Sequence, residues 1–267
     1  WELFSRGRSG TYVTSIATPP ATPDGLAAPA YITGVDFDGF RYESFGAIPL
    51  RHLTQTRGRN DGLADGTFVA FSEGEPRFMA VVGGWERQIS PRGGGGVSID
   101  GGLTWRGFQG DTGLRHPGLG YDPKFGQIAV GSTVSPTGTP ALVWIPRFAQ
   151  PLYSHDFGET WKESTGLPTL DRVDKPKERN SIVPNEFASW RALVADPVEG
   201  DTFYVYWNNY RNERAAHIYV SKDAGQTWKL AGPGIRLAWD QRRMTEWSLA
   251  AVPGRSGHLW LALDDTW

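Results

Sequence analysis

One octapeptide pattern, S-x-D-x-G-x-T-W, occurs three times in the chain and constrains the fold more than any other feature. The copies lie at 98–105, 154–161 and 221–228, so their starts are 56 and 67 residues apart. Such a period suits a unit of four short strands with loops of variable length. The pattern therefore predicts an all-β chain built from repeated four-stranded units, each marked by one octapeptide.

Each position of the octapeptide has a role in a tight hairpin. The Asp carboxylate can accept N–H groups of the turn, the Gly takes a positive φ, and the Thr and Trp begin the next strand. Strand-like runs precede the copies, as in the alternating segment 217–220. This motif is the Asp-box, whose turns lie away from the ligand face in β-propellers, so its residues are expected to be structural. They are Asp100, Trp105, Asp156, Trp161, Asp223 and Trp228.

The composition agrees with short strands and tight turns, and it excludes several kinds of function. The 267 residues include 34 Gly, 19 Pro and 12 Trp. A formal charge of -2 gives no electrostatic reason to expect nucleic acid or an anionic membrane. There is no Cys, no apolar run reaches the roughly 20 residues of a membrane span, and the five His have no paired spacing. We expect a neutral ligand and neither a cofactor nor a metal.

The length fits about five units of roughly 40–50 residues each. Segments 35–42 and 263–267 are candidates for degenerate units, and the charged stretch 170–185 is expected to be a rim loop. Because propellers often close with six or seven blades, we expect a β-propeller with four-stranded blades that is either small or part of a seven-bladed one. The opening Trp1, without Met or an apolar leader, indicates a processed or excised chain.

Several strings outside the boxes occur in a recognisable order. They are the glycine run 93–96, Q-I-A-V at 127–130, L-V-W-I-P at 142–146, E-S-T-G-L-P at 163–168, and the segments 194–206 and 252–262. This order resembles the second propeller of family 74 glycoside hydrolases, the xyloglucanases and related β-glucanases. The resemblance covers 77–267, whereas 1–76 align poorly and are expected to hold N-terminal blades. It implies one propeller domain over 1–267, or a piece of a larger two-propeller protein.

The resemblance implies inverting hydrolysis of a β-glucan by two carboxylates that face each other across a cleft between two propellers. In the second propeller the family's acid lies in a segment like A-L-G-D-V-G-G-F. The matching string here is M-A-V-V-G-G-W at 79–85, which puts Val81 where the Asp is expected. A valine cannot transfer a proton, so the mechanism is either lost or moved to a neighbour.

Three carboxylates are candidates for a relocated acid. Glu86 is the nearest to the Gly-Gly-Trp turn, although a surface glutamate paired with Arg87 is the simpler explanation. Asp36 and Asp38 form a second pair, in a Val-Asp-Phe-Asp context that also suits carboxylates capping a turn. Glu86 carries more weight than this pair.

Sugar binding needs flat aromatic faces for pyranose rings and amide or charged groups for hydroxyls. The segment 204–212 has this composition, and further Trp residues lie outside the boxes. The alternatives are that Tyr204 and Tyr206 cover the adjacent face of a strand and that the Trp side chains pack between blades. The candidate binding residues are Trp85, Arg87, Trp190, Tyr206, Trp207, Asn209, Tyr210 and Trp239.

Three functions remain open at this point. The first is a secreted or cell-surface carbohydrate-active propeller that hydrolyses a polysaccharide such as xyloglucan, with a second propeller or another chain as partner. The second is a non-catalytic glycan-binding propeller, which Val81 favours. The third is a protein-binding propeller similar to sortilin-type receptors or photosystem assembly factors, for which exposed aliphatic patches would be expected.

Overall fold

The structure is a computed structural model, and it describes residues 13–34, 37–49, 51–54, 63–86, 94–108, 125–133, 138–146, 150–168, 192–207, 217–232 and 247–263. All regular elements within these ranges are β-strands, and every strand pair is antiparallel. The all-β fold class is confirmed.

The described strands form five sheets, each of which follows the order of the chain. Four of the sheets have four strands, and the last has two. Blade 1 contains β1 (Val13–Ala17), β2 (Ala30–Gly34), β3 (Phe37–Tyr42) and β4 (Arg51–His52). Blade 2 contains β5 (Leu63–Phe71), β6 (Met79–Glu86), β7 (Gly95–Ser98) and β8 (Arg106–Gly107).

The remaining blades repeat this meander. Blade 3 contains β9 (Gln127–Val130), β10 (Leu142–Ile145), β11 (Leu152–Ser154) and β12 (Lys162–Glu163). Blade 4 contains β13 (Leu193–Ala195), β14 (Phe203–Trp207), β15 (His217–Ser221) and β16 (Lys229–Leu230). Blade 5 is the pair β17 (Trp247–Ala251) and β18 (Leu259–Leu263).

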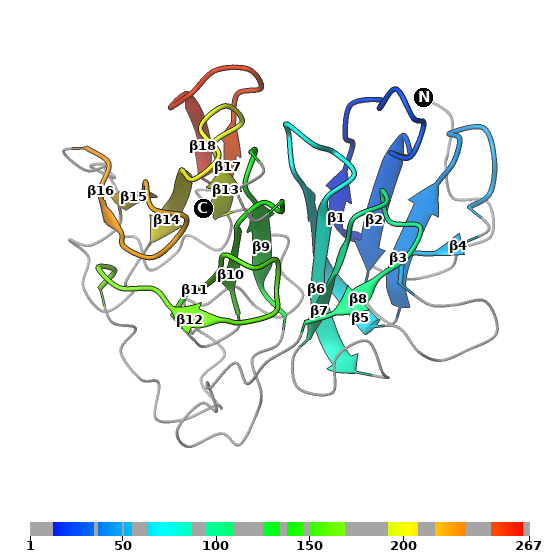
Figure 1. Cartoon of the computed structure of the whole chain (residues 1–267), viewed down its shortest axis with the longest axis horizontal. Helices are drawn as coiled ribbons and strands as arrows, with labels where there is room; N and C mark the ends of the chain where they lie inside the picture. The colour runs from blue at the N-terminus through cyan, green and yellow to red at the C-terminus, as the bar shows by residue number, and fades with distance from the viewer. Residues whose placement is uncertain are drawn as a thin grey trace.

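Successive blades pack against one another through their first strands. β1 contacts β5, β5 contacts β9, β9 contacts β13 and β13 contacts β17, so the first strand of each blade is the innermost. Figure 1 shows this order, with blade 1 in blue on the right and blades 3 and 4 on the left. This stacking of short meanders is the β-propeller architecture.

The hydrophobic core lies between blades rather than within one. Between blades 2 and 3, the ring of Trp144 lies 5.6 Å from that of Phe108 and 5.7 Å from that of Trp161, measured between centroids. Because blade 3 has a neighbour on each side, all four residues of β10 are buried instead of alternating. Each fully buried large side chain contributes about 1.5–3 kcal/mol to folding.

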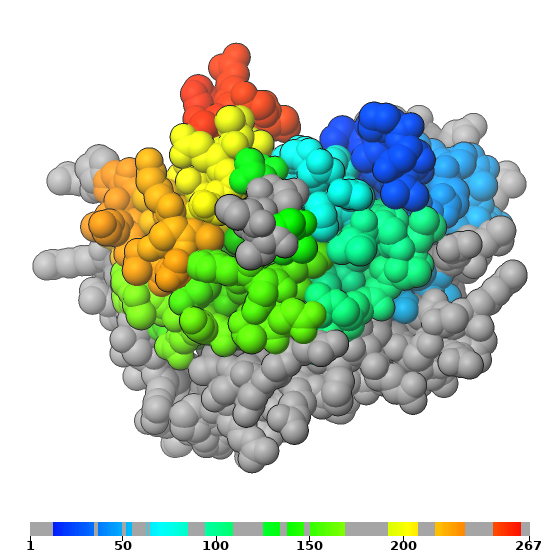
Figure 2. Space-filling view, in the orientation of Figure 1, coloured from blue at the N-terminus to red at the C-terminus, as the bar shows by residue number. Residues whose placement is uncertain are grey.

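The outward faces of the first and last blades are exposed. Ile16 on β1 is 51% exposed and Trp260 on β18 is 73% exposed. In Figure 2 the described residues of blade 5, in red, project from the body. The interior blades have no comparable exposed aromatic residue among the described positions.

The three boxes each connect the third and fourth strands of blades 2, 3 and 4, as their spacing predicts. The weaker segment 35–42 also belongs to a blade, but its described part is the strand β3, before the hairpin where a box would lie. Blade 1 therefore has no box between β3 and β4. Residues 264–267 and the charged stretch 170–185 lie outside the described residues.

Candidate functional site

The meander places the two kinds of predicted residue at opposite ends of the blades. In blade 2, Ser98 at the start of the box pairs with Met79, whereas Glu86 at the other end of β6 pairs with Leu63. In blade 4, Ser221 pairs with Phe203, at the end of β14 opposite Trp207. The boxes thus share one face, which we call the box face, and Glu86 and Trp207 lie on the opposite face.

One strand pairing and two hydrogen bonds on that opposite face connect Glu86 to Asp38. Glu86 pairs with Leu63 across the sheet of blade 2. The Leu63 N–H donates to the hydroxyl of Thr54 at 3.1 Å, and that hydroxyl donates to a carboxylate oxygen of Asp38 at 2.8 Å. The structure therefore brings two acidic positions, predicted separately from the sequence, to one junction between blades 1 and 2.

Asp38 is fully buried, and hydrogen bonds occupy its carboxylate. Its Oδ2 accepts from the N–H of Thr54 at 2.5 Å as well as from the hydroxyl, and its Oδ1 lies 3.0 Å from Nδ1 of His52. This geometry is that of the turn-capping alternative. A ligand cannot touch Asp38 directly in this arrangement, because the side chain has no exposed surface.

His52 is a functional candidate that sequence reasoning missed. Its side chain is 45% exposed, with Nδ1 held by the buried carboxylate, and its ring packs against that of Phe40 in a tilted arrangement, with 4.9 Å between centroids. The bond to the carboxylate fixes the orientation of the ring, so that its other nitrogen is directed away from Asp38. No motif marks it, because its partner Asp38 is 14 positions away.

Tyr206 and Trp207 do not form a stacking platform. They are 2% and 6% exposed, because β14 is buried on both faces between blades 3 and 5. Burial raises the pKa of Tyr206 to about 12, so its hydroxyl stays protonated at neutral pH. The Trp207 Nε1–H donates to the carbonyl of Pro168 at 3.2 Å. The packing alternative therefore describes these two side chains.

Val81 lies in the middle of β6 and is fully buried in the core between blades 1 and 2, with Tyr31 and Met79. It points at the neighbouring blade, in the interior rather than at a strand end. Glu86 is the last residue of the same strand, at the end of the blade opposite the box.

Other predicted residues are placed only in part. Trp85 and Glu86 belong to β6, where the backbone alone is described. Six further candidates lie outside the described residues: Asp36, Arg87, Trp190, Asn209, Tyr210 and Trp239. In the sequence, Arg87 directly follows β6, and Asn209 and Tyr210 come shortly after β14.

The box carboxylates close their own hairpins. In blade 3, Asp156 accepts from the Thr160 N–H at 2.8 Å, from the Thr160 hydroxyl at 2.5 Å and from the Ser154 hydroxyl at 2.8 Å. Asp100 and Asp223 make the same set of contacts. Partial burial alone would raise the pKa of each carboxyl, but these bonds outweigh it and hold the pKa below 3.8. They are suited to folding rather than to proton donation.

The aromatic residues that end the boxes differ in burial. Trp161 and Trp228 are buried, whereas Trp105 is half-buried and its Nε1–H donates to the carbonyl of Gly102 at 3.2 Å.

In the described parts of the chain, no three His, Asp or Glu side chains are close enough together to hold a metal ion. Nor do those parts contain a helix long and apolar enough to cross a bilayer.

Comparison with known proteins adds family information to this geometry. A family model for the BNR/Asp-box repeat matches residues 152–163 and 219–230. The xyloglucanase Xgh74A of Acetivibrio thermocellus is 24% identical over 266 residues, which cover 98% of this chain and 24% of that protein. A xyloglucanase of Paenibacillus sp. is 24% identical over 97% of this chain and 20% of its own length. The chain spans about a quarter of the length of the first of these relatives.

Two solved structures have the same fold. The family 74 xyloglucanase of Xanthomonas campestris matches with a TM-score of 0.61 and 21% identity, over 94% of this chain and 29% of that one. A family 74 enzyme of Niastella koreensis matches with a TM-score of 0.63 and 18% identity, over 95% and 28%. The matched share also reaches into residues 1–76, where the sequence alone showed little resemblance. The chain is therefore an Asp-box β-propeller that resembles the family 74 xyloglucanases.

Proposed function

We propose that the chain is part of a carbohydrate-active propeller that binds a β-glucan such as xyloglucan on the face opposite the boxes. One observation supports the proposal: Glu86 lies at the end of β6 on the face opposite the boxes, beside the blade 1 junction where His52 exposes 45% of its side chain. The similarity to two xyloglucanases over nearly the whole chain supports the choice of polysaccharide. Secretion or display at the cell surface belongs to the same proposal, because a polymeric glycan is met outside the cell.

The chemistry that we propose for the site is inverting hydrolysis. This reaction needs one carboxylic acid to protonate the leaving oxygen and one carboxylate to activate water. Glu86 is the candidate for one of these groups, because it lies at the end of β6, whereas Asp38 is sequestered by Thr54 and His52. The second carboxylate would come from a second propeller or from another chain across the cleft.

Non-catalytic glycan binding is the second candidate function. Two observations favour it: Val81 lies where the family resemblance expects an acid, and the Asp38 carboxylate is fully buried. Binding without hydrolysis would need only aromatic and hydrogen-bonding side chains on the same face.

The test is incubation of the purified protein, together with the second propeller or partner chain that would supply the other carboxylate, with xyloglucan and with mixed-linkage glucan, following both new reducing ends and binding. Glu86→Gln keeps the size of the side chain but cannot exchange the proton. Glu75→Gln, on the box-face turn where Glu75 pairs with Arg77, is the matched control. We expect oligosaccharide release that Glu86→Gln abolishes and Glu75→Gln leaves unchanged. Binding without release would select the second function, and absence of both would overturn the proposal.

A further inference from the structure

The fourth residue of each Asp-box has an unusual backbone conformation. Gly101, Phe157 and Ala224 have φ values of 65°, 54° and 57°, in the left-handed region. Within its own blade the N–H of this residue is used: that of Gly101 donates to the Arg77 carbonyl at 3.0 Å, and that of Ala224 to the Asp201 carbonyl at 2.8 Å. The carbonyl groups of the same turn also need hydrogen-bond donors.

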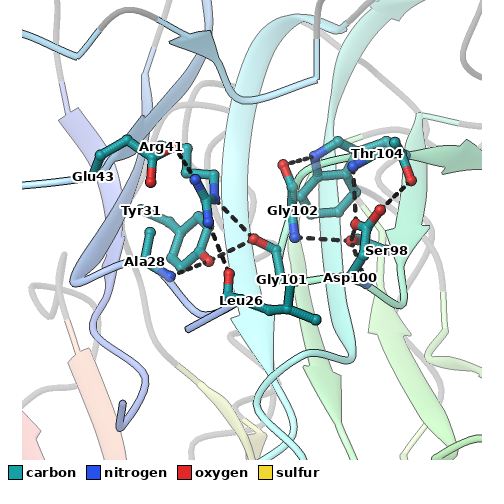
Figure 3. Close-up of polar contacts among 11 residues, drawn as sticks. Leu26, Ala28, Tyr31, Arg41, Glu43, Ser98, Asp100, Gly101, Gly102 and Thr104 are labelled. Carbon is teal, nitrogen blue, oxygen red and sulfur yellow. Dashed lines mark hydrogen bonds and ion pairs between the residues drawn. The ribbon is translucent and has the colours of Figure 1, made fainter. Parts of the chain in front are cut away.

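In the first case the donors come from blade 1. Arg41 on β3 is buried, and its Nε–H donates to the carbonyl of Gly101 at 3.0 Å. The hydroxyl of Tyr31 on β2 donates to the same carbonyl at 2.6 Å. The rest of the Arg41 guanidinium bonds the Leu26 carbonyl at 2.8 Å and pairs with Glu43. Figure 3 shows Arg41 and Tyr31 converging on Gly101 from the side opposite Asp100.

In the second case the donor comes from blade 2. Arg106 on β8 donates from Nη2 to the carbonyl of Phe157 at 3.0 Å, and its Nη1 pairs with Glu159. Phe157 is the fourth residue of the box in blade 3, and so it occupies the same position as Gly101 in blade 2. Arg41 and Arg106 lie on different strands of their blades, yet both reach the same turn carbonyl of the following blade.

In the third case blade 3 supplies a smaller donor. The Ser164 hydroxyl donates to the carbonyl of Gly225, the fifth residue of the box in blade 4, at 2.6 Å. The neighbouring Thr165 exchanges two backbone hydrogen bonds with the same turn: its N–H donates to Gln226 and its carbonyl accepts from Trp228, each at 2.9 Å. Every described box thus receives a polar donor from the blade before it.

We propose that each Asp-box is a two-sided connector, and that Arg41, Arg106 and Ser164 are positioning residues that fix the angle between consecutive blades. The box carboxylate accepts hydrogen bonds within its own hairpin. The carbonyl groups of the turn accept hydrogen bonds from the preceding blade. The apolar faces between blades are non-directional, so they do not by themselves set an angle. Hydrogen bonds are directional, and the cost of misplacement is largest at the buried Arg41, where a misplaced blade would leave the charge and the Gly101 carbonyl unpaired. The inference is independent of the proposed function.

The test is hydrogen–deuterium exchange on Arg41→Met, which keeps most of the side-chain volume but removes every donor. We expect exchange in 98–105 and 24–31 to accelerate roughly tenfold or more, the effect of losing a hydrogen bond to a charged group. The boxes at 154–161 and 221–228 keep their wild-type rates. Arg41→Lys, which keeps the charge but has a single ammonium nitrogen in place of the forked guanidinium, restores part of the protection at 98–105. Arg77→Met is the matched control, because the Arg77 side chain is half exposed and contacts Glu75 and the Phe78 ring, while its backbone carbonyl, which accepts the Gly101 N–H, is kept in the variant.

Arg106→Met provides the second arm, and it keeps the test decisive if Arg41→Met does not fold. Arg106 is partly exposed, so its loss leaves the core between blades in place. The accelerated exchange should then move to 154–161 and leave 98–105 unchanged. Equal acceleration in all three boxes, or wild-type exchange in the box facing the substituted arginine, would overturn the proposal.

Discussion

Blades 1 and 3 share the four-stranded meander, but only blade 3 closes its outer hairpin with an Asp-box. In blade 3, Asp156 accepts the N–H and the hydroxyl of Thr160. In blade 1, Asp38 accepts the same two groups from Thr54, 16 positions away and at the opposite end of the blade. The same carboxylate–threonine pair can therefore close either end of a blade. What the box adds is a turn whose carbonyls are available to the preceding blade.

The largest expected effect concerns the box tryptophan, for which blade 1 has no counterpart. Trp161→Ala should lower the free energy of unfolding by about 3–5 kcal/mol, because the ring packs 4.9 Å from that of Phe108 in the core between blades 2 and 3. His52→Ala, on the outer strand of blade 1, should cost about 1 kcal/mol or less, since half of its side chain is exposed. Urea denaturation measures both, and equal losses would show that the outer edges of the two blades are equivalent.

The two carboxylate–threonine pairs should differ in strength. Asp38→Ala leaves the buried N–H and hydroxyl of Thr54 without their acceptor, and we expect a loss of about 2–4 kcal/mol. Asp156→Ala should cost about 1–2 kcal/mol, because Thr160 is exposed and water can replace the carboxylate. The unfolding free energies of both variants test this order. A larger loss at Asp156 would mean that the box, rather than burial, dominates.

A comparison of alanine substitutions at two glycines distinguishes the cost of backbone strain from the cost of a steric clash between blades. Gly101 and Gly254 have φ values of 65° and 71°, so an alanine is strained at either position. A Cβ on Gly101 would lie 2.2 Å from the Leu26 carbonyl of blade 1, whereas nothing lies within 4 Å of one on Gly254. We expect Gly254→Ala to cost about 1 kcal/mol and Gly101→Ala about 1–2 kcal/mol more. Thermal unfolding of both variants gives the difference, and equal costs would argue against a close contact between blade 1 and the box.

The smallest effect is on the pH dependence of stability. The hydrogen bonds in the boxes hold the pKa of Asp100, Asp156 and Asp223 below 3.8, the value of an unperturbed aspartate. The unfolded chain therefore binds more protons as the pH falls below about 4, and the stabilisation is lost as the pH drops through the folded pKa values. The urea midpoint should fall in this range, and less steeply for Asp156→Asn. If the urea midpoint of Asp156→Asn fell as steeply with pH as that of the wild type, the Asp156 carboxyl would not contribute to the pH dependence.

The repeated architecture could be predicted because the box is a local signal. Its turn, its glycine and its following strand lie within eight consecutive residues, so the sequence alone places Asp100, Asp156 and Asp223 correctly in hairpins. The hydrogen bond from Arg41 to the Gly101 carbonyl joins residues 60 positions apart, so no local sequence pattern predicts it. The same holds for Asp38 with His52 and Thr54, which are joined only when β3 and β4 pair.

The proposed binding surface is harder to predict, because the inner strands of the interior blades are buried on both faces. Alternation along a strand normally separates core from surface, yet all five residues of β14 are buried. The aromatic and amide composition around Tyr206 and Trp207 therefore indicated a platform where packing between blades 3 to 5 accounts for these two rings. In the sequence, Glu86 stands out only because it follows the segment 79–85 that resembles the family. Its closeness to the hydrogen bonds of Asp38 depends on the pairing of Glu86 with Leu63 in the folded sheet.

The most direct test of the proposed binding face is hydrogen–deuterium exchange with and without xyloglucan oligosaccharides. We predict protection at the strand ends opposite the boxes, at Gly84–Glu86 on β6, at Trp207 on β14 and at His217 on β15. The boxes at 98–105, 154–161 and 221–228 should exchange as in the free protein. Protection confined to the boxes, or none at any position at saturating oligosaccharide, would contradict the account.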